Sequence, residues 1–407
     1  MIECLFIGDE LLDGRILNRN QQQITAILAN EGFYVAQATT LSDQKESLED
    51  FFSSSIKRSN IVITTGGLGP TEDDRTTECL SNALNLERII NEDILKALEE
   101  YYDSKNKFFF KSNIKQAYFP EGAVILKNDF GTAPGFALQH GQTWFFVLPG
   151  IPNEMEHMLN NEVLPILNKE CNEYKQFRQT SLFKCYGLGE SECSDRLASV
   201  YPLPKNMDIT FQVKFPEIHI RLNNHSQNNF NKFNTIETQI SDFLGSACFT
   251  KDNETNFLNY IFNFLKQKKL IAAFAESCTG GLTSSLITSL PGASEVFDYS
   301  VISYSNASKC NLLDVPVEFI NKYGAVSAEV AEFMAESCLK KSKANICISI
   351  TGIAGPSGGS EVKPVGTVYF GLATKTNIIS FKEFYPTTRT RFQYLAAYKA
   401  LSLLLKS

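Results

Sequence analysis

A serine and a lysine in the C-terminal part of the chain have the chemistry of a nucleophile and its base. Ser277 follows a predicted strand over residues 270–275 and precedes a Thr-Gly-Gly run. Such a strand-to-helix turn exposes a hydroxyl beside helix N-terminal amides that can stabilise an oxyanion. A serine nucleophile needs a base, but all four histidines lie at or before residue 225. A lysine with a lowered pKa is the usual substitute, and Lys309 follows a strand-like run over 299–303.

Each of these residues also has a purely structural interpretation. Ser277 would serve as a helix N-cap, because serines are common at helix starts, and Lys309 would be a solvated surface charge. Spacing alone favours these structural interpretations. Cys278 is a second possible nucleophile, because a thiol at a helix N-terminus has a lowered pKa. Adjacent residues leaving a strand point to opposite sides, so only one of Ser277 and Cys278 can face the site.

The second candidate site is a glycine-rich loop in the N-terminal part of the chain. It follows a β-branched strand predicted over 61–65, and we expect a helix over 71–86 with Pro70 well placed as its first residue. Glycine amides at a helix N-terminus favour a phosphate, and Asp73 and Asp74 can hold a divalent cation against a diphosphate. A tight turn with acidic residues in the first helical turn explains the loop alone equally well.

The elements around this loop favour the functional interpretation. Strands alternate with helices over residues 1–168, which predicts an α/β domain with a parallel sheet. In a parallel sheet Asp9 and Glu10, at the end of the first strand, lie near the edge that carries the glycine loop.

Two further domains follow in the sequence. We expect a small α+β linker domain over 169–252, in which the Asn-rich segment 225–235 is a loop. Residues 253–407 predict another α/β domain. Its two junctions between a strand and a glycine-rich turn, near 276–281 and 351–356, indicate a site at the strand ends.

Composition excludes several classes of protein. The chain has 407 residues, of which 43% are hydrophobic and 12% aromatic, so it has ample apolar surface for folded cores. A net charge of −7 argues against a general nucleic-acid binder or a protein of anionic membranes. No apolar run approaches the roughly 20 residues of a membrane span. The ten cysteines include no CxxC pair, which is typical of reduced thiols, so we expect a cytoplasmic protein.

Four motifs in order give the N-terminal part a specific resemblance. They are Gly8–Gly14 with Asn18 and Asn20, the glycine loop, Asn128–Gly135 and Leu148–Met155. Together they resemble the three-layer molybdopterin-binding-like domain that opens the CinA, or competence-damage-inducible, family. The resemblance implies a metal-dependent pyrophosphatase that cleaves ADP-ribose to AMP and ribose 5-phosphate. The implied substrate-binding residues are Asp9, Glu10, Asn18, Asn20, Gly66, Gly67, Gly69 and Thr76, and the implied ligands of a divalent metal are Asp73 and Asp74. Arg19 and Glu72 depart from the residues that are common in the family.

The C-terminal part resembles the other half of the same family. The motifs are Ala275–Gly281, Tyr304–Lys309, Gly324–Ser327, Thr351–Pro356 and Pro364–Val368. They look like the CinA C-terminal domain, a nicotinamide-nucleotide amidase that hydrolyses nicotinamide mononucleotide (NMN) to nicotinate mononucleotide and ammonia without a metal.

The resemblance assigns roles to residues at the matching positions. Ser277 is the implied nucleophile and Lys309 its general base, while Tyr304 and Asn306 orient that pair or the carboxamide. On this basis we favour Ser277 over Cys278 and interpret Cys278 as buried packing. The implied substrate-binding residues are Glu276, Thr279, Gly280, Thr351, Gly352, Gly355 and Arg389. The segment before the last predicted helix departs from the family, because it lacks a Gly-Asp pair ahead of Arg389.

The resulting hypothesis is a bifunctional hydrolase of pyridine-nucleotide salvage that acts on NMN and ADP-ribose. The resemblance also implies a homodimer, and we expect neither nucleic acid nor membrane as a direct partner. Two alternatives remain. One is an interaction protein of competence or DNA repair, and the other is an N-terminal domain that binds a pterin without turnover. Ammonia release from NMN distinguishes the first alternative, and metal-dependent turnover of ADP-ribose the second.

Overall fold

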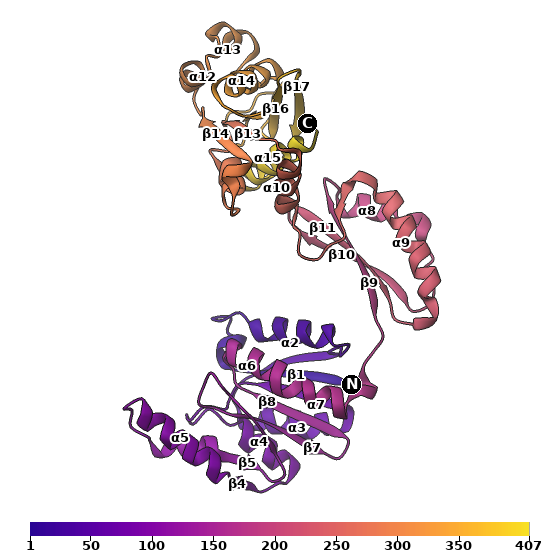
Figure 1. Ribbon diagram of the computed structural model, residues 1–407, viewed down its shortest axis with the longest axis vertical. Coiled ribbons are helices and arrows are strands. Elements are labelled where there is room, and N and C mark those ends of the chain that lie inside the picture. Colours follow the sequence, from indigo (N-terminus) through magenta and orange to yellow (C-terminus); the bar gives the residue numbers. More distant parts are fainter. Residues whose placement is uncertain (407) are drawn as a thin grey trace. The chain divides into compact units, whose positions relative to one another are not determined.

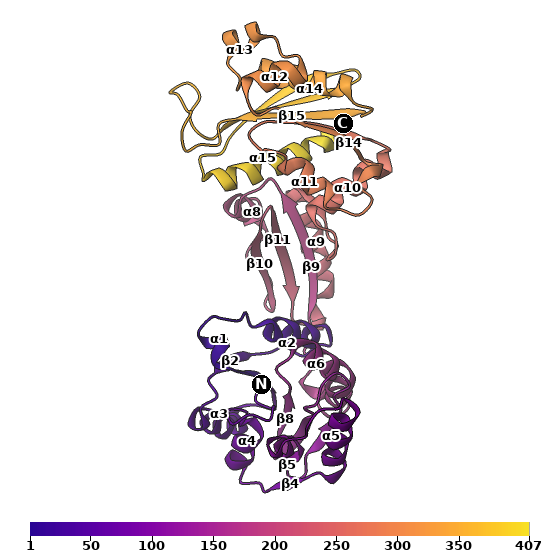
Figure 2. The ribbon, with the colours of Figure 1, turned by 90° about the vertical axis from the view of Figure 1, so that its left-hand side faces the viewer.

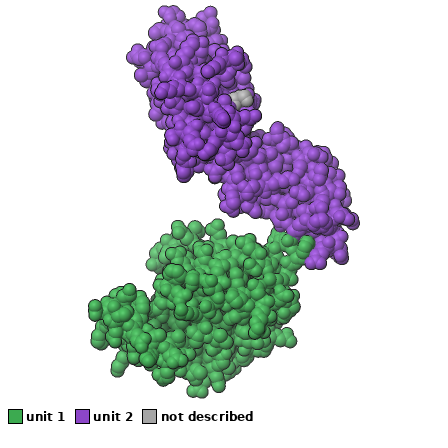
Figure 3. Space-filling view, viewed as in Figure 1, with its two compact units in different colours: residues 1–178 green, residues 179–407 purple. Residues whose placement is uncertain are grey.

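The computed structural model describes residues 1–406 and divides the chain into two compact units, residues 1–178 and 179–407 (Figure 3). The linker domain predicted over 169–252 therefore shares the second unit with the C-terminal sheet from Gln179 onward. Over the residues that the structure describes, no helix combines the length and the apolar character that a membrane span requires.

The first unit is built on a six-stranded sheet of order β2-β1-β3-β8-β7-β6. The strands are β1 (Ile2–Ile7), β2 (Gln37–Leu41), β3 (Ile61–Thr65), β6 (Val124–Leu126), β7 (Gly135–His140) and β8 (Thr143–Leu148). The predicted parallel arrangement holds for β2, β1, β3 and β8, whereas β7 runs antiparallel to both of its neighbours, β8 and β6. The reason is the short connection between β7 and β8, since a tight hairpin can join only antiparallel strands.

Helices cover both faces of this sheet and give it three layers (Figure 1). Leu28 of one layer packs with Phe6 and Phe146, and Phe52 of the other packs with Leu5 and Phe145. The helices of the first layer are α2 (Arg19–Asn30), α6 (Pro152–Met158) and α7 (Leu164–Glu170), and those of the second are α3 (Lys45–Arg58) and α4 (Thr76–Leu84). The carboxyl ends of β1, β3 and β8 therefore meet at one edge, where the glycine loop begins.

The prediction of a helix over 71–86 was wrong at its start, because α4 begins only at Thr76. The Asp74 carboxylate accepts hydrogen bonds from both the backbone N–H and the hydroxyl of Thr71, 2.9 and 2.5 Å long. A side chain that hydrogen-bonds the backbone of a nearby residue in this way can compete with the helix and favour a turn. Pro70 is therefore a loop residue, and the glycine loop does not run directly into a helix N-terminus.

The second unit begins with a four-stranded antiparallel sheet of order β10-β11-β9-β12. The strands are β9 (Gln179–Tyr186), β10 (Met207–Lys214), β11 (Glu217–Asn224) and β12 (Cys248–Thr250), with helices α8 (Glu190–Arg196) and α9 (Phe230–Leu244). The Asn-rich segment 225–235 was predicted as a loop, but α9 starts inside it at Phe230. Phe233 and Ile236 open the buried stripe of that helix, which the polar residues between them obscured.

The C-terminal sheet has five strands in the order β14-β13-β15-β16-β17. They are β13 (Ala272–Glu276), β14 (Phe297–Ile302), β15 (Ile346–Gly352), β16 (Thr367–Thr374) and β17 (Ile378–Phe384). Strands β14, β13 and β15 are parallel, and β16 runs antiparallel to both of its neighbours, β15 and β17. The carboxyl ends of the three parallel strands lie at one edge, where such sheets place their ligands.

Two groups of helices sandwich this sheet, as Figure 2 shows. One face carries α10 (Phe257–Lys268), α11 (Leu282–Thr288) and α15 (Arg389–Leu403), and the other carries α12 (Asn306–Leu313), α13 (Val317–Tyr323) and α14 (Ala328–Lys341). Phe274 and Ile348 pack toward the first group, whereas Ala273 and Cys347 face the second.

Candidate functional site

Ser277 and Lys309 meet at the carboxyl edge of the C-terminal sheet. Ser277 is the first residue after β13, and its backbone N–H donates to the carbonyl of Ile350 on β15. Lys309 lies on α12, which follows β14. Its ammonium nitrogen Nζ is 2.8 Å from Ser277 Oγ and 2.8 Å from the carbonyl oxygen of Ser303. The structure therefore brings the predicted nucleophile and base into direct hydrogen-bond contact.

The surroundings of Lys309 favour its neutral form. The residue is only 2% exposed, and burial lowers the pKa of its ammonium from 10.5 to about 8. It has no carboxylate partner among the ion pairs of the described residues. Removing a charged amine from water without giving it a counter-charge makes the neutral base easier to form. Lys309 is therefore not the solvated surface charge of the structural interpretation.

Cys278 points away from this chemistry. It is 5% exposed and packs in the apolar cluster between the sheet and α10, α11 and α15. Burial raises the pKa of its thiol to about 12, so almost none is present as thiolate near neutral pH. The geometry agrees with the interpretation of Cys278 as packing.

Glu276 was expected to bind substrate, but the structure gives its carboxylate another use. The residue is fully buried, and its two oxygens accept the backbone N–H groups of Gly281, Thr283 and Ser284 and the hydroxyl of Ser284, at 2.6–3.1 Å. These are the otherwise unpaired amides at the start of α11. Glu276 thus caps that helix and fixes the turn that holds Ser277.

Tyr304 and Arg389 form a second polar group at the same edge. The Arg389 guanidinium donates to the carbonyl of Gly355 at 2.9 Å and to the hydroxyl of Tyr304. Arg389 is the first residue of α15, so this arginine ties the loops that follow β14 and β15 to the start of the last helix. Tyr304 is 56% exposed and contacts Arg389 rather than the Ser277–Lys309 pair.

The other predicted residues of this half occupy varied positions. Asn306 is exposed at the first position of α12, and Gly280 is exposed with φ +62° in the turn after Ser277. The hydroxyl of Thr351 donates to the carbonyl of Ala325 at 2.8 Å, so it braces the loop before α14. Gly352 is needed for packing, since a Cβ there would lie 3.0 Å from both Phe392 and a backbone carbonyl. Thr279 is 3% exposed, and its Oγ1 has no partner in the described chain.

Two residues that sequence reasoning missed also shape this site. Ser303 supplies the carbonyl that holds Lys309, and its own buried hydroxyl has no hydrogen-bond partner within residues 1–406. Gln393, one helical turn after Arg389, donates to the carbonyl of Cys278 at 2.9 Å. No signal in the sequence identifies a backbone carbonyl as a hydrogen-bond partner of a lysine. The four-residue spacing of Arg389 and Gln393, which places both on one helix face, was a signal that could have identified Gln393.

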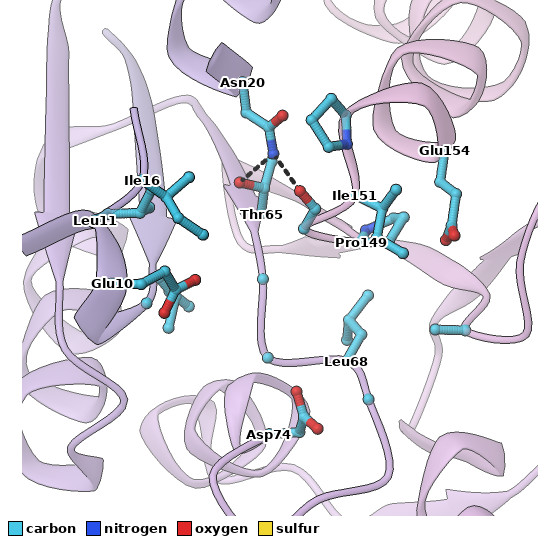
Figure 4. Close-up of a pocket in the computed structure, with 18 of the residues that line it drawn as sticks. Glu10, Leu11, Ile16, Asn20, Thr65, Leu68, Asp74, Pro149, Ile151 and Glu154 are labelled. Carbon is cyan, nitrogen blue, oxygen red and sulfur yellow. Dashed lines mark hydrogen bonds between the residues drawn. The ribbon is translucent and has the colours of Figure 1, made fainter. Parts of the chain in front are cut away.

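The glycine loop of the first unit lines a cavity of about 920 Å³. Predicted residues that line it are Glu10, Asn18, Asn20, Gly66, Gly67, Gly69, Asp73 and Asp74. Figure 4 shows Glu10 and Asp74 on one side and Asn20, Pro149 and Glu154 on another. Asp9 lies outside this lining but close enough to act electrostatically on a carboxylate within it.

Thr76 has a supporting position under the loop instead of a place in the cavity. It is fully buried, and its hydroxyl donates to the carbonyl of Gly66 at 2.7 Å. A Cβ at Gly67, whose φ is +67°, would lie 2.2 Å from Thr76 Oγ1. The loop thus needs a glycine at this position for both space and backbone conformation.

Asp43 is the acidic residue of this cavity that sequence reasoning missed. It lies just after β2 and lines the cavity with Glu10, Asp73 and Asp74. Burial, together with the charges of these three and of Asp9, raises the pKa of its carboxyl to about 6. Nothing in the local sequence distinguishes Asp43, because its place depends on the pairing of β2 with β1.

A residue that lines the same cavity carries a buried oxygen without a hydrogen-bond partner in the described part of the chain. Asn20 is 8% exposed, and its amide nitrogen donates to Gly150 O at 2.8 Å and reaches Thr65 Oγ1 at 3.5 Å (Figure 4). Its Oδ1 has no partner in the described part of the chain. Asn18 caps α2 through its oxygen, and its buried Nδ2 is likewise unpaired among residues 1–406. Buried polar atoms without partners are uncommon and mark places where a ligand or water completes the hydrogen bonding.

Comparison with known proteins covers both halves of the chain. A model of the CinA C-terminal domain matches residues 254–407, and a model described as a probable molybdopterin binding domain matches residues 3–169. A putative competence-damage inducible protein of Caldicellulosiruptor bescii is 38% identical over 407 residues, which cover 99% of this chain and 98% of that protein. One of the same description from Clostridium tetani is 37% identical, covering 100% and 99%.

Solved structures match a part of the chain. The crystal structure of the competence/damage inducible protein CihA from Agrobacterium tumefaciens is 34% identical and covers 37% of this chain and 92% of its own, with a TM-score of 0.36. The full-length identity to the curated relatives and the two matched domains, in this order, define the chain's family. It belongs to the CinA family of competence-damage inducible proteins, with a molybdopterin-binding-type domain ahead of the CinA C-terminal domain.

Proposed function

We propose that the C-terminal domain is an amidase that hydrolyses the carboxamide of NMN. One observation carries the proposal: a buried lysine with a lowered pKa lies 2.8 Å from the hydroxyl of a serine at the carboxyl edge of an α/β sheet. A serine beside a base of this kind is the arrangement of nucleophilic acyl transfer. Membership of the CinA family directs the choice of NMN as substrate.

The first half of the reaction uses Lys309 as a base and then as an acid. Neutral Lys309 takes the proton of Ser277 Oγ as that oxygen attacks the carboxamide carbon. The backbone N–H of Thr279 has no backbone acceptor among the described residues, and it is the donor that would stabilise the oxyanion that forms. The carbon–nitrogen bond then breaks, and Lys309 gives its proton to the departing nitrogen, which leaves as ammonia. The nucleotide remains as an ester on Ser277.

The second half returns the enzyme to its starting state. Water attacks the ester carbon and gives a proton to Lys309, which passes it to Ser277 Oγ as the ester bond breaks. The Ser303 carbonyl holds one N–H of Lys309 throughout, which keeps the nitrogen beside Ser277 and leaves its lone pair available for the proton of Oγ in the neutral state. The sum is NMN plus water giving nicotinate mononucleotide plus ammonia.

The test measures ammonia release from NMN in excess chelator, by the wild-type protein and by the Lys309→Ala variant under the same conditions. Activity that survives chelation and disappears in the variant supports an amidase that relies on Lys309. An inactive wild type refutes the proposal and leaves the interaction protein of competence or DNA repair as the better account of this half.

We further propose that the first unit is a metal-dependent ADP-ribose pyrophosphatase. The observation that favours it is the crowding of Asp43 with Glu10, Asp73 and Asp74 around a cavity whose floor is a glycine loop. Such carboxylates repel one another unless a cation lies among them. Within residues 1–406 no three Asp, Glu, His or Cys side chains make a complete metal site. One or two carboxylates together with substrate phosphates are the usual environment of Mg²⁺.

The donor set therefore fits a divalent cation that binds with the diphosphate. Asp73 and Asp74 would hold it, with the charge of Asp43 close by, and when bound it would supply charge neutralisation at the scissile phosphate. The chain's own residues orient the substrate. The backbone amides of Gly67 and Gly69, which line the cavity, would face the phosphates.

Asp43→Asn provides the test. It keeps the size of the side chain and removes one negative charge, so we expect the Mg²⁺ concentration for half-maximal ADP-ribose turnover to rise by about tenfold or more. Deamidation of NMN by the same variant is the internal control and should not change. An unchanged Mg²⁺ requirement would place the metal elsewhere. Tight pterin binding without ADP-ribose turnover would replace this proposal altogether.

A further inference from the structure

One side of α15 contacts three loops of the candidate amidase site. From its first residue, Arg389 reaches the carbonyl of Gly355 and the hydroxyl of Tyr304. One turn later Gln393 reaches the carbonyl of Cys278, next to the nucleophile. These contacts join the loops after β13, β14 and β15. The position of the first two turns of α15 therefore decides where Arg389 lies relative to Ser277.

The opposite side of the same two turns is held by the preceding four-stranded sheet. Phe215 forms the tip of the β10–β11 hairpin, between Lys214 and Glu217. Its ring is edge-on to Tyr394 and Tyr398 of α15, with centroids 6.4 and 5.7 Å apart. The Arg391 guanidinium lies 6.0 Å from the centre of the same ring. One aromatic side chain thus contacts Arg391, Tyr394 and Tyr398, which lie along one side of the helix.

A second anchor makes the hairpin a fixed support. At the first residue of β11, next to the hairpin tip, Glu217 Oε1 accepts a hydrogen bond from the backbone N–H of Phe257, the first residue of α10, at 2.6 Å. The Tyr186 ring of β9 is stacked on Phe257 with centroids 3.8 Å apart. Lys184, also on β9, is 3% exposed and donates to the carbonyls of Asn253 and Thr255 at 2.6 and 2.8 Å. Buried polar contacts of this kind fix the sheet against the C-terminal domain.

We propose that Phe215, at the tip of the β10–β11 hairpin, is a positioning residue of the amidase site: it holds the start of α15 so that Arg389 can bind the phosphate of the substrate. The inference rests on the proposed amidase function. It gives the linker sheet a task beyond connection. It also explains the direction of Arg391, which contacts the hairpin ring and leaves Arg389 as the arginine at the site.

The chemistry predicts a specific kinetic pattern. Phe215 does not touch the Ser277–Lys309 pair, so the rate of the bond-breaking steps should survive its removal. An arginine–phosphate contact acts on substrate binding. We therefore expect Phe215→Ala to raise KM for NMN by about five- to tenfold while kcat stays within about twofold, since uniform binding is what is lost. Phe215→Tyr keeps the ring and should restore the wild-type KM.

The experiment combines these kinetics with hydrogen exchange on the full-length protein. Val213→Ala is the matched control, because Val213 is an apolar residue of the same hairpin, 59% exposed, and not part of the ring cluster. We expect faster exchange of residues 386–395 in Phe215→Ala and no change in Val213→Ala. Phe215→Leu gives the same comparison with a smaller perturbation if the alanine variant does not fold.

Each outcome decides the matter. A raised KM together with faster exchange at the start of α15 supports the proposal. Unchanged exchange overturns it, and so does faster exchange with an unchanged KM, because the hairpin would then brace the helix without positioning Arg389. If the wild-type protein does not deamidate NMN, the proposed function fails. The hydrogen-exchange data then test only whether Phe215 holds the start of α15, and unchanged exchange in Phe215→Ala overturns that claim as well.

Discussion

The lowered pKa of Lys309 predicts the pH dependence of the amidase. A base acts only when it is neutral, and burial moves the pKa of this amine from 10.5 to about 8. At pH 7 about 9% of the lysine is then neutral, against about 0.03% at its ordinary pKa, which is a gain of roughly 300-fold in active base. We therefore expect kcat/KM for NMN to rise about tenfold per pH unit below pH 8 and to level off above it.

Lys309→Arg isolates this effect from charge and hydrogen bonding. The guanidinium keeps a positive charge and several N–H donors for Ser277 Oγ and the Ser303 carbonyl, but it does not lose a proton in the accessible pH range. The variant should show no turnover at any pH between about 6 and 10, whereas the wild type follows the ascending limb.

The assay is direct chromatographic measurement of nicotinate mononucleotide, because a coupled enzyme would add its own pH dependence. A wild-type profile that is flat between about pH 6 and 8 would refute the reasoning, as would an arginine variant that keeps a tenth or more of the activity.

Three further predictions follow from the contacts of single residues. Glu276→Gln should cost about 2–3 kcal/mol of unfolding free energy in urea titration, because an amide cannot replace a buried carboxylate that accepts four hydrogen bonds; a change below about 0.5 kcal/mol would contradict the capping role. Gly67→Ala should abolish ADP-ribose turnover and spare NMN deamidation, since its Cβ would meet Thr76 Oγ1 at 2.2 Å; retained turnover would show that the loop has another path. The difference in unfolding free energy between the wild type and Lys309→Met should be constant below pH 8 and should rise by about 3 kcal/mol in favour of the wild type from pH 8 to 10.5. The reason is that Lys309 is protonated in the unfolded state and neutral in the folded state over that pH range; a difference that stays constant up to pH 10.5 would mean that the pKa of Lys309 is not lowered.

Local sequence signals were sufficient for the strands that carry both sites. The β-branched run Ile61–Thr65 appears as β3, and the apolar run 270–275 appears, two residues shorter at its start and one longer at its end, as β13, because a strand buried on both faces needs apolar residues. The serine–lysine pair was identified by motif, and its hydrogen bond depends on two elements 32 residues apart that only the sheet brings together. The lowered pKa follows from burial, which spacing does not reveal.

The misses have physical causes of the same kind. The helix expected to start at residue 71 starts later, because the Asp74 side chain hydrogen-bonds Thr71 and stabilises a turn there. The loop expected over 225–235 is partly helical, because its apolar residues belong to a buried stripe that continues to Leu244. Glu276 matched a family motif, but its role as a cap depends on where α11 starts. Asp43 and Phe215 depend on strand pairing and on a hairpin packing against a helix far along the chain. Tertiary contacts of this range have no local signature.

The identity of the nucleophile is the central claim, and one comparison tests it most directly. Initial rates of nicotinate mononucleotide formation from NMN would be measured in excess chelator for the wild type, Ser277→Ala and Cys278→Ala. We predict a loss of at least about 10⁴-fold for Ser277→Ala, as expected when a nucleophile is removed from a unit that includes its base. Cys278→Ala should keep most of the activity, because its thiol is buried in the core. A Ser277→Ala protein that still deamidates within about a hundredfold of the wild type would contradict the account.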